Sequence, residues 1–348
     1  MRNEKIDAIK GICIILMVIG HSGCPDLLRS FIYCFHMPCF FLVSGYLFRE
    51  NYYLQPKQFV WKRCKSLYWP FVKWSFLFLF FHNFFYSVFF YSTCYGLQDY
   101  LYKSVKILTM TGSEQLLGGF WFLKESFYSS IISFVVLLIN YQYRLLSNMA
   151  FIVIGLLLFA CLYSYSPVKL PAIGVRTLLA SAYFVTGYVM MKYVGNKVFN
   201  LPKAIGLSMA VFVLLFSLCC NSWDMEIVEY RVPIYYMVSL AGILFVFSIV
   251  SCIKGAFRRY VVLAGRHSLD ILVFHFLLFK LVSVCIVACF DMPVERIAEF
   301  PVIKDCNALT WVVYAVIGVS LSLVIGEMLD QLNKCIHKKL SDKVSAYG

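Results

Sequence analysis

Long uncharged apolar runs recur along this chain of 348 residues, and they constrain its fold more than any other feature. A segment of about 20 apolar residues is what an α-helix needs to cross the hydrocarbon core of a bilayer. The sequence therefore predicts an all-α integral membrane bundle, which we read as one domain over residues 1–348 with a short cytoplasmic tail over about 330–348. The ten candidate transmembrane helices cover about 6–22, 31–48, 67–90, 119–139, 147–165, 176–193, 203–220, 232–253, 262–290 and 308–329.

The composition supports this reading, because 61% of the residues are hydrophobic, only 14% are charged, and the mean hydropathy is +0.77. A water-soluble domain is about a quarter charged. A disordered chain, a coiled coil and an ordinary soluble enzyme are therefore excluded. The first run follows Arg2 and Lys5 like a signal peptide, but it lacks a small-residue cleavage pattern, so we expect a retained helix.

The distribution of Lys and Arg among the loops predicts the orientation. With both termini in the cytoplasm, twenty of the 31 basic residues fall in inner segments, eight fall in outer loops and three fall within spans. Inner loops of membrane proteins carry the excess of basic residues. We therefore expect cytoplasmic termini, contact with membrane lipids, and a location in the inner or plasma membrane.

The net charge of +13 and the 14 cysteines suggest other functions that the pattern does not favour. The basic residues form no basic helix or aromatic-interleaved patch, so we expect no nucleic-acid partner. Most cysteines lie in apolar runs, where a thiol behaves as a small hydrophobe, and no Cys-x-x-Cys pair suggests a metal. Cys24, Cys94 and Cys306 fall in predicted outer loops, where disulfide pairing stays open.

Ionisable residues inside membrane segments are costly and mark candidate sites. In the first span, the eleven-residue step from Lys10 to His21 leaves them about 20° apart around the helix and about 16 Å apart along it. Asp7 can pair with Lys10 at an i, i+3 spacing. One reading is an interfacial Lys10 and a His21 that caps the helix. The other is a channel with an anion-attracting cation at its mouth and a titratable histidine farther in.

The second span begins near Phe35-His36-Met37-Pro38, and Pro38, two residues after His36, predicts a kink. Ser44 and Gly45 permit close approach of another helix or of a ligand, although ordinary helix packing would use the same residues. The following inner segment carries Lys62 and Arg63. These cations can hold a phosphate-bearing ligand, or they are simply positive-inside charge.

These blocks together resemble the membrane acyltransferase 3 family. Lys10 and His21 are similar to its Arg/Lys-(ten residues)-His signature, and the run from His36 to Phe48 resembles its second-helix block, closest to the branch of fucose 4-O-acetylase-like enzymes. Further blocks are the basic segment before Pro70, Gly119-Phe120-Trp121-Phe122-Leu123, and Gly265-Arg266-His267-Ser268-Leu269 leading to His275. The resemblance spans about residues 5–280.

The sequence departs from the family at three places. Lys10 stands where Arg is frequent, which keeps the charge but loses bidentate phosphate recognition. His267 stands where Asn is frequent. Lys124 and Glu125 follow the Trp121 block where apolar or proline residues are usual, and as neighbours on a helix we expect each to need its own partner.

The resemblance implies an enzyme that moves an acyl group, by default acetyl, from cytoplasmic acyl-CoA to a hydroxyl of a cell-surface glycan or lipid-linked sugar, without a metal. It assigns Lys10, Lys62 and Arg63 to the phosphates of coenzyme A. His21 would be a general base or a transient acyl carrier, and His36 would orient it or relay a proton. Ser44, Trp121 and His275 are candidate substrate contacts. The sugar, the acyl chain and the oligomeric state stay open.

Two other functions were weighed. A secondary transporter of an organic anion or sugar would also have ten helices and buried ionisable residues. A non-catalytic scaffold would not explain the cost of those residues in lipid. We expect Asp270, Lys280 and Glu327 to make interhelical polar contacts, His82 to be packed rather than functional, and His337 to lie in the tail.

Overall fold

The computed structural model describes residues 3–146, 148–220, 223–225, 231–304 and 309–347, the last of these with side chains up to residue 336. Helix accounts for 79% of the structure, and the described residues form no strand, as the apolar runs predict. The α-helices are α1 (Glu4–His21), α2 (Asp26–Tyr33), α3 (His36–Tyr46), α4 (Pro56–Arg63), α5 (Trp69–Phe80), α6 (His82–Ser87), α7 (Leu97–Leu108), α8 (Trp121–Tyr143), α9 (Ala150–Tyr165), α10 (Val175–Tyr193), α11 (Lys203–Cys219), α12 (Val232–Ile249), α13 (Gly255–Arg266), α14 (Ser268–Cys289) and α15 (Thr310–Tyr347). Short 3₁₀ segments are η1 (Glu50–Tyr53), η3 (Gln115–Phe120), η4 (Gly195–Asn200) and η5 (Val294–Ala298).

Within the described residues, five helical segments are long and apolar enough to cross a membrane: Asp26–Tyr46, Gln115–Tyr143, Val232–Ile249, Ser268–Cys289 and Thr310–Ile336. Two shorter apolar helices are Ala150–Tyr165 and Lys203–Cys219. Each of the ten predicted ranges contains a helix. Ten complete spans and cytoplasmic termini stay predictions.

The second predicted helix is divided by a bend at Phe35, whose backbone φ is −141°. The sequence predicted a kink at Pro38. Pro38 instead lies in the first turn of α3, where a missing N–H breaks no hydrogen bond. The bend precedes it, and it separates Tyr33 on α2 from His36 on α3.

The predicted helix over 67–90 differs most from the structure. It ends at Phe80, and the short α6 follows. The twelve residues of α5 reach only about 18 Å, against about 30 Å of hydrocarbon. A π-helical segment, η2 (Cys64–Tyr68), joins α5 to α4. It precedes Pro70, which cannot donate the helical hydrogen bond, and a wider turn absorbs the loss.

Two further features of the structure, a helix break and an additional helix, differ from the sequence prediction. The range 262–290 is interrupted at His267, which ends α13 before α14 begins. The amphipathic helix α7 lies in a stretch that the sequence analysis assigned to an outer loop. Because Lys103 and Lys106 interrupt its apolar residues, this stretch does not stand out as a long uncharged run.

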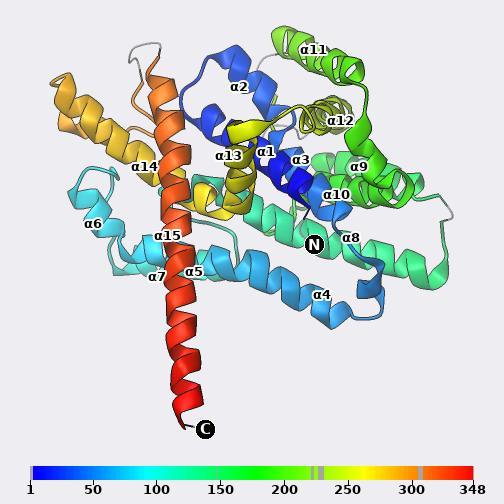
Figure 1. Cartoon of the computed structure of the whole chain (residues 1–348), viewed down its shortest axis with the longest axis horizontal. Helices are drawn as coiled ribbons and strands as arrows, with labels where there is room; N and C mark the ends of the chain where they lie inside the picture. The colour runs from blue at the N-terminus through cyan, green and yellow to red at the C-terminus, as the bar shows by residue number, and fades with distance from the viewer. Residues whose placement is uncertain (1–2, 147, 221–222, 226–230, 305–308, 348) are drawn as a thin grey trace.

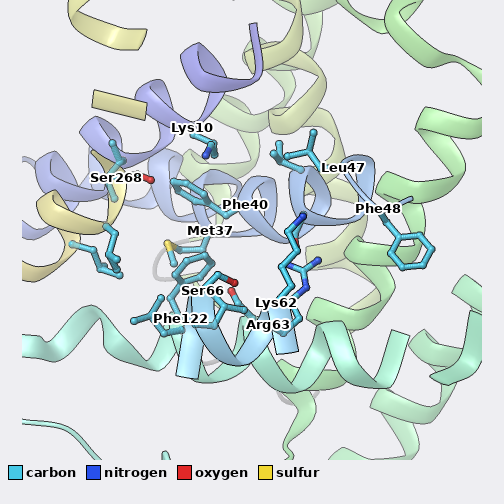
Figure 2. Close-up of a pocket in the computed structure, with 18 of the residues that line it drawn as sticks. Lys10, Met37, Phe40, Leu47, Phe48, Lys62, Arg63, Ser66, Phe122 and Ser268 are labelled. Atoms are coloured by element: carbon cyan, nitrogen blue, oxygen red, sulfur yellow. The ribbon is translucent and has the colours of Figure 1, made fainter. Parts of the chain in front are cut away.

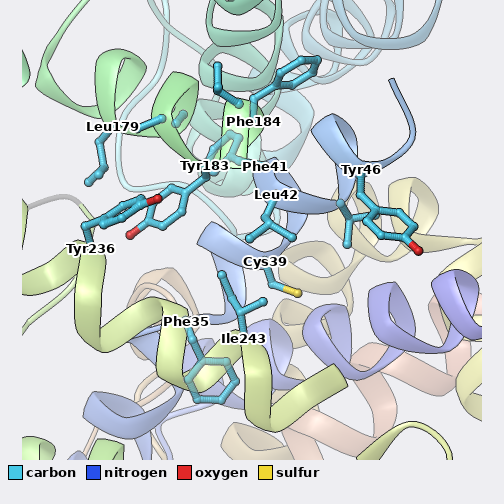
Figure 3. Packing of buried hydrophobic residues seen from close by; sticks show 14 of the residues in the cluster. Phe35, Cys39, Phe41, Leu42, Tyr46, Leu179, Tyr183, Phe184, Tyr236 and Ile243 are labelled. Carbon is cyan, nitrogen blue, oxygen red and sulfur yellow. The ribbon is translucent and has the colours of Figure 1, made fainter. Parts of the chain in front are cut away.

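Figure 1 shows α4 and α5 in line along one side of the molecule, with α8 beside them and α15 projecting past the other helices at the C-terminus. One apolar cluster joins α3, α10 and α12, and Figure 3 shows Leu42, Tyr183 and Ile243 meeting there. A second cluster joins α5, α14 and α15. Helix α1 contributes to both clusters, so it lies where they meet.

Glycine permits the two closest helix crossings. An added Cβ at Gly45 of α3 would lie 1.8 Å from the Phe184 carbonyl oxygen of α10, and one at Gly11 of α1 would lie 1.8 Å from the Val261 oxygen of α13. Small residues allow helix backbones to approach in this way in membranes. The prediction that Gly45 admits another helix is confirmed, and these crossings fix α1 and α3, which carry His21 and His36.

Candidate active site

A first cavity, of about 340 Å³, collects the three cations that the sequence analysis assigned to an anionic ligand. Lys10 reaches it from α1, while Lys62 and Arg63 reach it from α4. Figure 2 shows Lys10 and the Lys62–Arg63 pair on opposite sides of this inner cavity. Ser44 and Ser66 also line it, and none of its described lining residues is a carboxylate. This cavity can therefore hold a ligand with several negative charges.

Neighbouring groups hold the three cations in place. Lys62 Nζ donates a hydrogen bond to Tyr52 Oη at 2.8 Å, and the Arg63 guanidinium lies 5.0 Å above the ring of Phe59. The predicted Lys10–Asp7 pair is present, with Nζ and Oδ1 4.0 Å apart. Arg266 Nε also lies 3.8 Å from Asp7 Oδ2. One buried carboxylate, that of Asp7, thus lies beside two cations.

Tyr52 belongs to η1, which Glu50 ties to α10. The Glu50 carboxylate accepts hydrogen bonds from Lys192 Nζ at 2.8 Å and from Tyr188 Oη at 2.6 Å. The Lys192 hydrogen bond, followed by that of Tyr188, holds the pKa of Glu50 below its ordinary value. These contacts fix the segment that presents Tyr52 to Lys62.

A second cavity, of about 570 Å³, contains the histidine of the first helix. His21 lines this outer cavity together with His36 and Trp121. Its other aromatic residues are Tyr33, Trp223, Phe276 and Phe300, and its charged residues are Arg29, Asp224 and Lys304. The cavity thus combines aromatic rings with charged and polar side chains, which suits a sugar-sized ligand.

The hydrogen bonds around His21 define its reactive nitrogen. Tyr33 Oη donates to the Gly20 carbonyl oxygen at 3.1 Å and lies 3.2 Å from His21 Nδ1. We assign the hydroxyl proton of Tyr33 to the Gly20 carbonyl oxygen, so that the Tyr33 oxygen accepts from Nδ1–H of His21. The neutral ring then carries its lone pair on Nε2. Sequence reasoning missed Tyr33, because a lone tyrosine twelve residues after a histidine carries no motif.

His36 and His275 are fixed in the same tautomer. His36 Nδ1 donates to the Ile32 carbonyl oxygen at 2.8 Å, and His275 Nδ1 lies 2.9 Å from the Ile271 oxygen. His36 lines the outer cavity. His275 does not line it, but its ring stacks against His21 with centroids 5.7 Å apart. Its buried Nε2 has no hydrogen-bond partner among the residues that the structure describes, which is rare for a buried polar atom.

The two cavities adjoin without being one cavity. Lys10 lines only the inner cavity and His21 only the outer one, whereas Met17, Met37 and Leu272 line both. One of the two interpretations of the Lys10–His21 spacing was a single channel along α1. The structure instead interposes three apolar side chains between the cation and the imidazole.

The expectation that Lys124 and Glu125 each need their own partner holds for Glu125, which has Thr177, but the two residues also pair with each other. Lys124 Nζ lies 3.2 Å from Glu125 Oε1, since the long lysine side chain can curl round the helix. The buried Glu125 also accepts a hydrogen bond from Thr177 Oγ1 at 2.5 Å. Ser126, the next residue, lines the inner cavity. The pair therefore ties α8 to α10 beside that cavity.

Other predicted polar residues make structural contacts. His267 lies 2.9 Å from Asp270 on α14 and 2.9 Å from Glu327 on α15, and Lys280 Nζ donates to the carbonyl oxygens of Ile297 and Glu299. The predicted interhelical contacts are confirmed for Glu327. His82 is packed, as expected, in a buried pair with Glu114.

Cys24 and Cys94 form no disulfide, whereas Cys306 and the side chain of His337 lie outside the described residues. Within the described part of the chain, no group of three or more His, Cys, Asp or Glu side chains is arranged to hold a metal ion.

Comparison with known proteins gives one finding about the whole chain. A family model described as an acyltransferase domain matches residues 3–327. The match begins before the first motif and extends past the last one, into α15. No curated protein and no solved structure matches the chain.

Proposed function

This chain belongs to the acyltransferase 3 family of membrane acyltransferases, and from that premise we propose that it is an O-acyltransferase of the cell membrane. It takes an acyl group, in the simplest case acetyl, from cytoplasmic acyl-CoA. It transfers that group to a hydroxyl of a cell-surface glycan or lipid-linked sugar, in the manner of the fucose 4-O-acetylase-like branch. The observation that carries the proposal is the pair of adjoining cavities, one lined by three cations and one by histidines.

The inner cavity fits the donor. Coenzyme A presents phosphates, which Lys10, Lys62 and Arg63 would bind. Aromatic side chains beside these cations offer surfaces for the adenine base; they are Phe40, Phe48, Tyr52, Phe59 and Phe122. Ser44, on the same wall, would contact the donor by its hydroxyl. Binding the nucleotide here would leave the thioester end to extend toward His21.

The outer cavity fits the acceptor. Sugar rings stack on aromatic faces, and Trp121 offers one next to the Arg176 guanidinium, 5.6 Å from its ring. His36 lies on the same cavity with a lone pair on Nε2 and would accept a hydrogen bond from an acceptor hydroxyl. The reacting hydroxyl would then face His21.

His21 Nε2 supplies the base for the transfer. In the direct route, Nε2 takes the proton of the acceptor hydroxyl as its oxygen bonds to the thioester carbon. The carbon–sulfur bond breaks, and the thiolate of coenzyme A recovers the proton from Nε2. Tyr33 holds Nδ1–H throughout, so the ring can carry the transient positive charge.

A two-step route uses the same atom as a nucleophile. Nε2 would bond to the thioester carbon as the carbon–sulfur bond breaks and the thiolate leaves. The acceptor oxygen would then bond to the acyl carbon as the bond from that carbon to Nε2 breaks, and the hydroxyl proton would pass to the freed Nε2 and on to the thiolate. Incubation of the purified protein with radiolabelled acetyl-CoA and no acceptor distinguishes the routes. Label that stays on the protein and is lost on addition of acceptor supports the second route, and its absence in an active preparation supports the first.

The test of the function is release of free coenzyme A. The protein in liposomes receives acetyl-CoA and a panel of pyranoside acceptors, and free thiol and acetylated sugar are measured together. We expect both products in equal amounts from the wild type and neither from His21→Ala, with coenzyme A binding retained in both by calorimetry. Uptake of a sugar without thioester loss would favour a transporter, a function that no comparison supports.

A further inference from the structure

The inner and outer cavities meet at a partition made of three apolar side chains. Met17, Met37 and Leu272 each line both cavities, and they are only 1%, 6% and 3% exposed. Figure 2 shows Met37 below Phe40 at the inner cavity. Anything that passes from the cations to His21 by way of these cavities must displace these side chains.

Each residue of the partition lies close in sequence to a histidine of the site. Met17 is one helical turn before His21 on α1, Met37 follows His36 on α3, and Leu272 lies three residues before His275 on α14. The Leu272 carbonyl oxygen, moreover, lies 3.1 Å from Nδ1 of His275. The partition and the histidines therefore belong to the same three helices.

Leu272 packs against Gly119, which has no side chain to fill the space. An added Cβ at Gly119 would lie 2.7 Å from Leu272 Cδ1. Gly119 itself lines the outer cavity. A methyl group there would push the leucine side chain out of its present place, so this glycine sets the position of one side of the partition.

A protein that opens toward both sides of a membrane must not conduct ions. Apolar constrictions exclude water and ions from a pore by dewetting. Methionine side chains are unbranched and flexible, so they can move aside for a slender apolar group and then close again.

We propose that Met17, Met37 and Leu272 form a selective seal, which admits the acyl-pantetheine arm of the donor to the outer cavity. The seal keeps the charged nucleotide on the inner side, and its width limits the size of the acyl group that reaches His21. The identity of the donor rests on the proposed function, whereas the sealing role does not.

Leakage through purified protein in liposomes tests the seal without any acyl transfer. Liposomes that enclose a pH-sensitive dye receive an imposed proton gradient. We expect no more proton leak with the wild type than with the control Met191→Ala, whose side chain is exposed on α10. We expect Met17→Ala/Met37→Ala to raise the leak about tenfold or more, because the apolar constriction is lost. The volume-conserving Met17→Leu/Met37→Leu should stay tight.

Donor selectivity tests the second part of the proposal. Transfer from acetyl-, butyryl- and hexanoyl-CoA is compared, and the double alanine variant should shift preference toward the longer chains. Gly119→Ala should change the ratio of butyryl to acetyl transfer without weakening coenzyme A binding. A double alanine variant that folds, remains tight to protons and keeps the wild-type chain preference overturns the seal. If no acyl-CoA is used by any variant, the proposed function fails, and the leak measurement still decides the seal.

Discussion

The imidazole rings of His21 and His275 stack with centroids 5.7 Å apart and planes inclined by 28°, although the two residues are far apart in the sequence. His275 Nδ1 faces two carbonyl oxygens of its own helix, so Nε2 carries the lone pair, and this buried atom has no partner. Leaving a buried polar atom unpaired costs about 1–3 kcal/mol. A phenylalanine would pack there without that cost. We therefore interpret His275 as a residue that contributes to the reaction and does not only fill space.

His275→Phe tests this interpretation. The phenyl ring keeps the volume and removes the unpaired nitrogen, so we expect the thermal stability to be unchanged or higher. We expect kcat for acyl transfer to fall about 10- to 100-fold, below the full effect of losing a general base, with KM for acyl-CoA nearly unchanged. Steady-state kinetics and thermal unfolding check both. A variant with wild-type kcat would show that His275 only packs.

Tyr33→Phe addresses the tautomer of His21. Without the hydroxyl oxygen, Nδ1–H loses its acceptor, and the ring populates both tautomers. We expect kcat to fall about tenfold. The specific readout is ¹⁵N NMR of histidine-labelled protein, in which His21 should change from the Nδ1–H form to a mixture. The control is Tyr46→Phe, whose hydroxyl bonds Asn196 away from both cavities. A His21 signal that is unchanged in the Tyr33 variant would contradict the assignment.

The cations of the inner cavity should act on donor binding. Lys62→Ala and Arg63→Ala each remove one charge from the cavity, and we expect KM for acetyl-CoA to rise about tenfold while kcat changes little, because a charge-assisted hydrogen bond contributes about 1.5–3 kcal/mol. Dephospho-coenzyme A should lose less affinity than coenzyme A in whichever variant binds the 3′-phosphate. Lys57→Ala is the matched control, since Lys57 is exposed on the same helix and does not line the cavity. Equal effects from Lys57 and Lys62 would refute a specific site.

The sequence predicted the residues that line the site more accurately than it predicted the helices that carry them. Lys10, Lys62 and Arg63 line one cavity, as charge and motif spacing suggested, and His21, His36 and Trp121 line the next. Residues of one motif keep their spacing along a helix, so their relative positions on that helix can be predicted from the sequence.

What the sequence did not reveal depends on contacts between distant segments or on breaks in helices. The partition of Met17, Met37 and Leu272 requires three helices to converge, and ordinary apolar residues give no local signal of that. The bend at Phe35 lies inside a continuous apolar run, where hydropathy alone cannot divide a helix. The π-helical turn before Pro70 lies in a basic segment, whose charge pattern does not indicate a change of helix type. The pairing of His82 with Glu114 was not predicted either, because it joins two segments that are distant in the sequence.

His82 and Glu114 lead to a prediction about stability rather than catalysis. His82 Nδ1 lies 2.6 Å from Glu114 Oε2, and Nε2 lies 3.0 Å from the Thr93 carbonyl oxygen. Both ring nitrogens thus face acceptors, which is the arrangement of an imidazolium paired with a carboxylate. The two side chains are 2% and 1% exposed, so this is a buried ion pair that ties α6 to the segment before η3.

Glu114→Gln should therefore lower the free energy of unfolding by about 3 kcal/mol, because it leaves a buried charge without its partner. Lys103→Ala, which removes the half-buried cation 3.9 Å from Glu114, should cost less than about 1 kcal/mol. The double variant His82→Phe/Glu114→Leu should be more stable than Glu114→Gln, since it removes both charges. Thermal unfolding in detergent measures all three, and KM for acyl-CoA should stay at the wild-type value. If Glu114→Gln were as stable as the wild type, the pair would not be ionised, and the anchoring of α6 would have to come from the tyrosine rings that stack on His82.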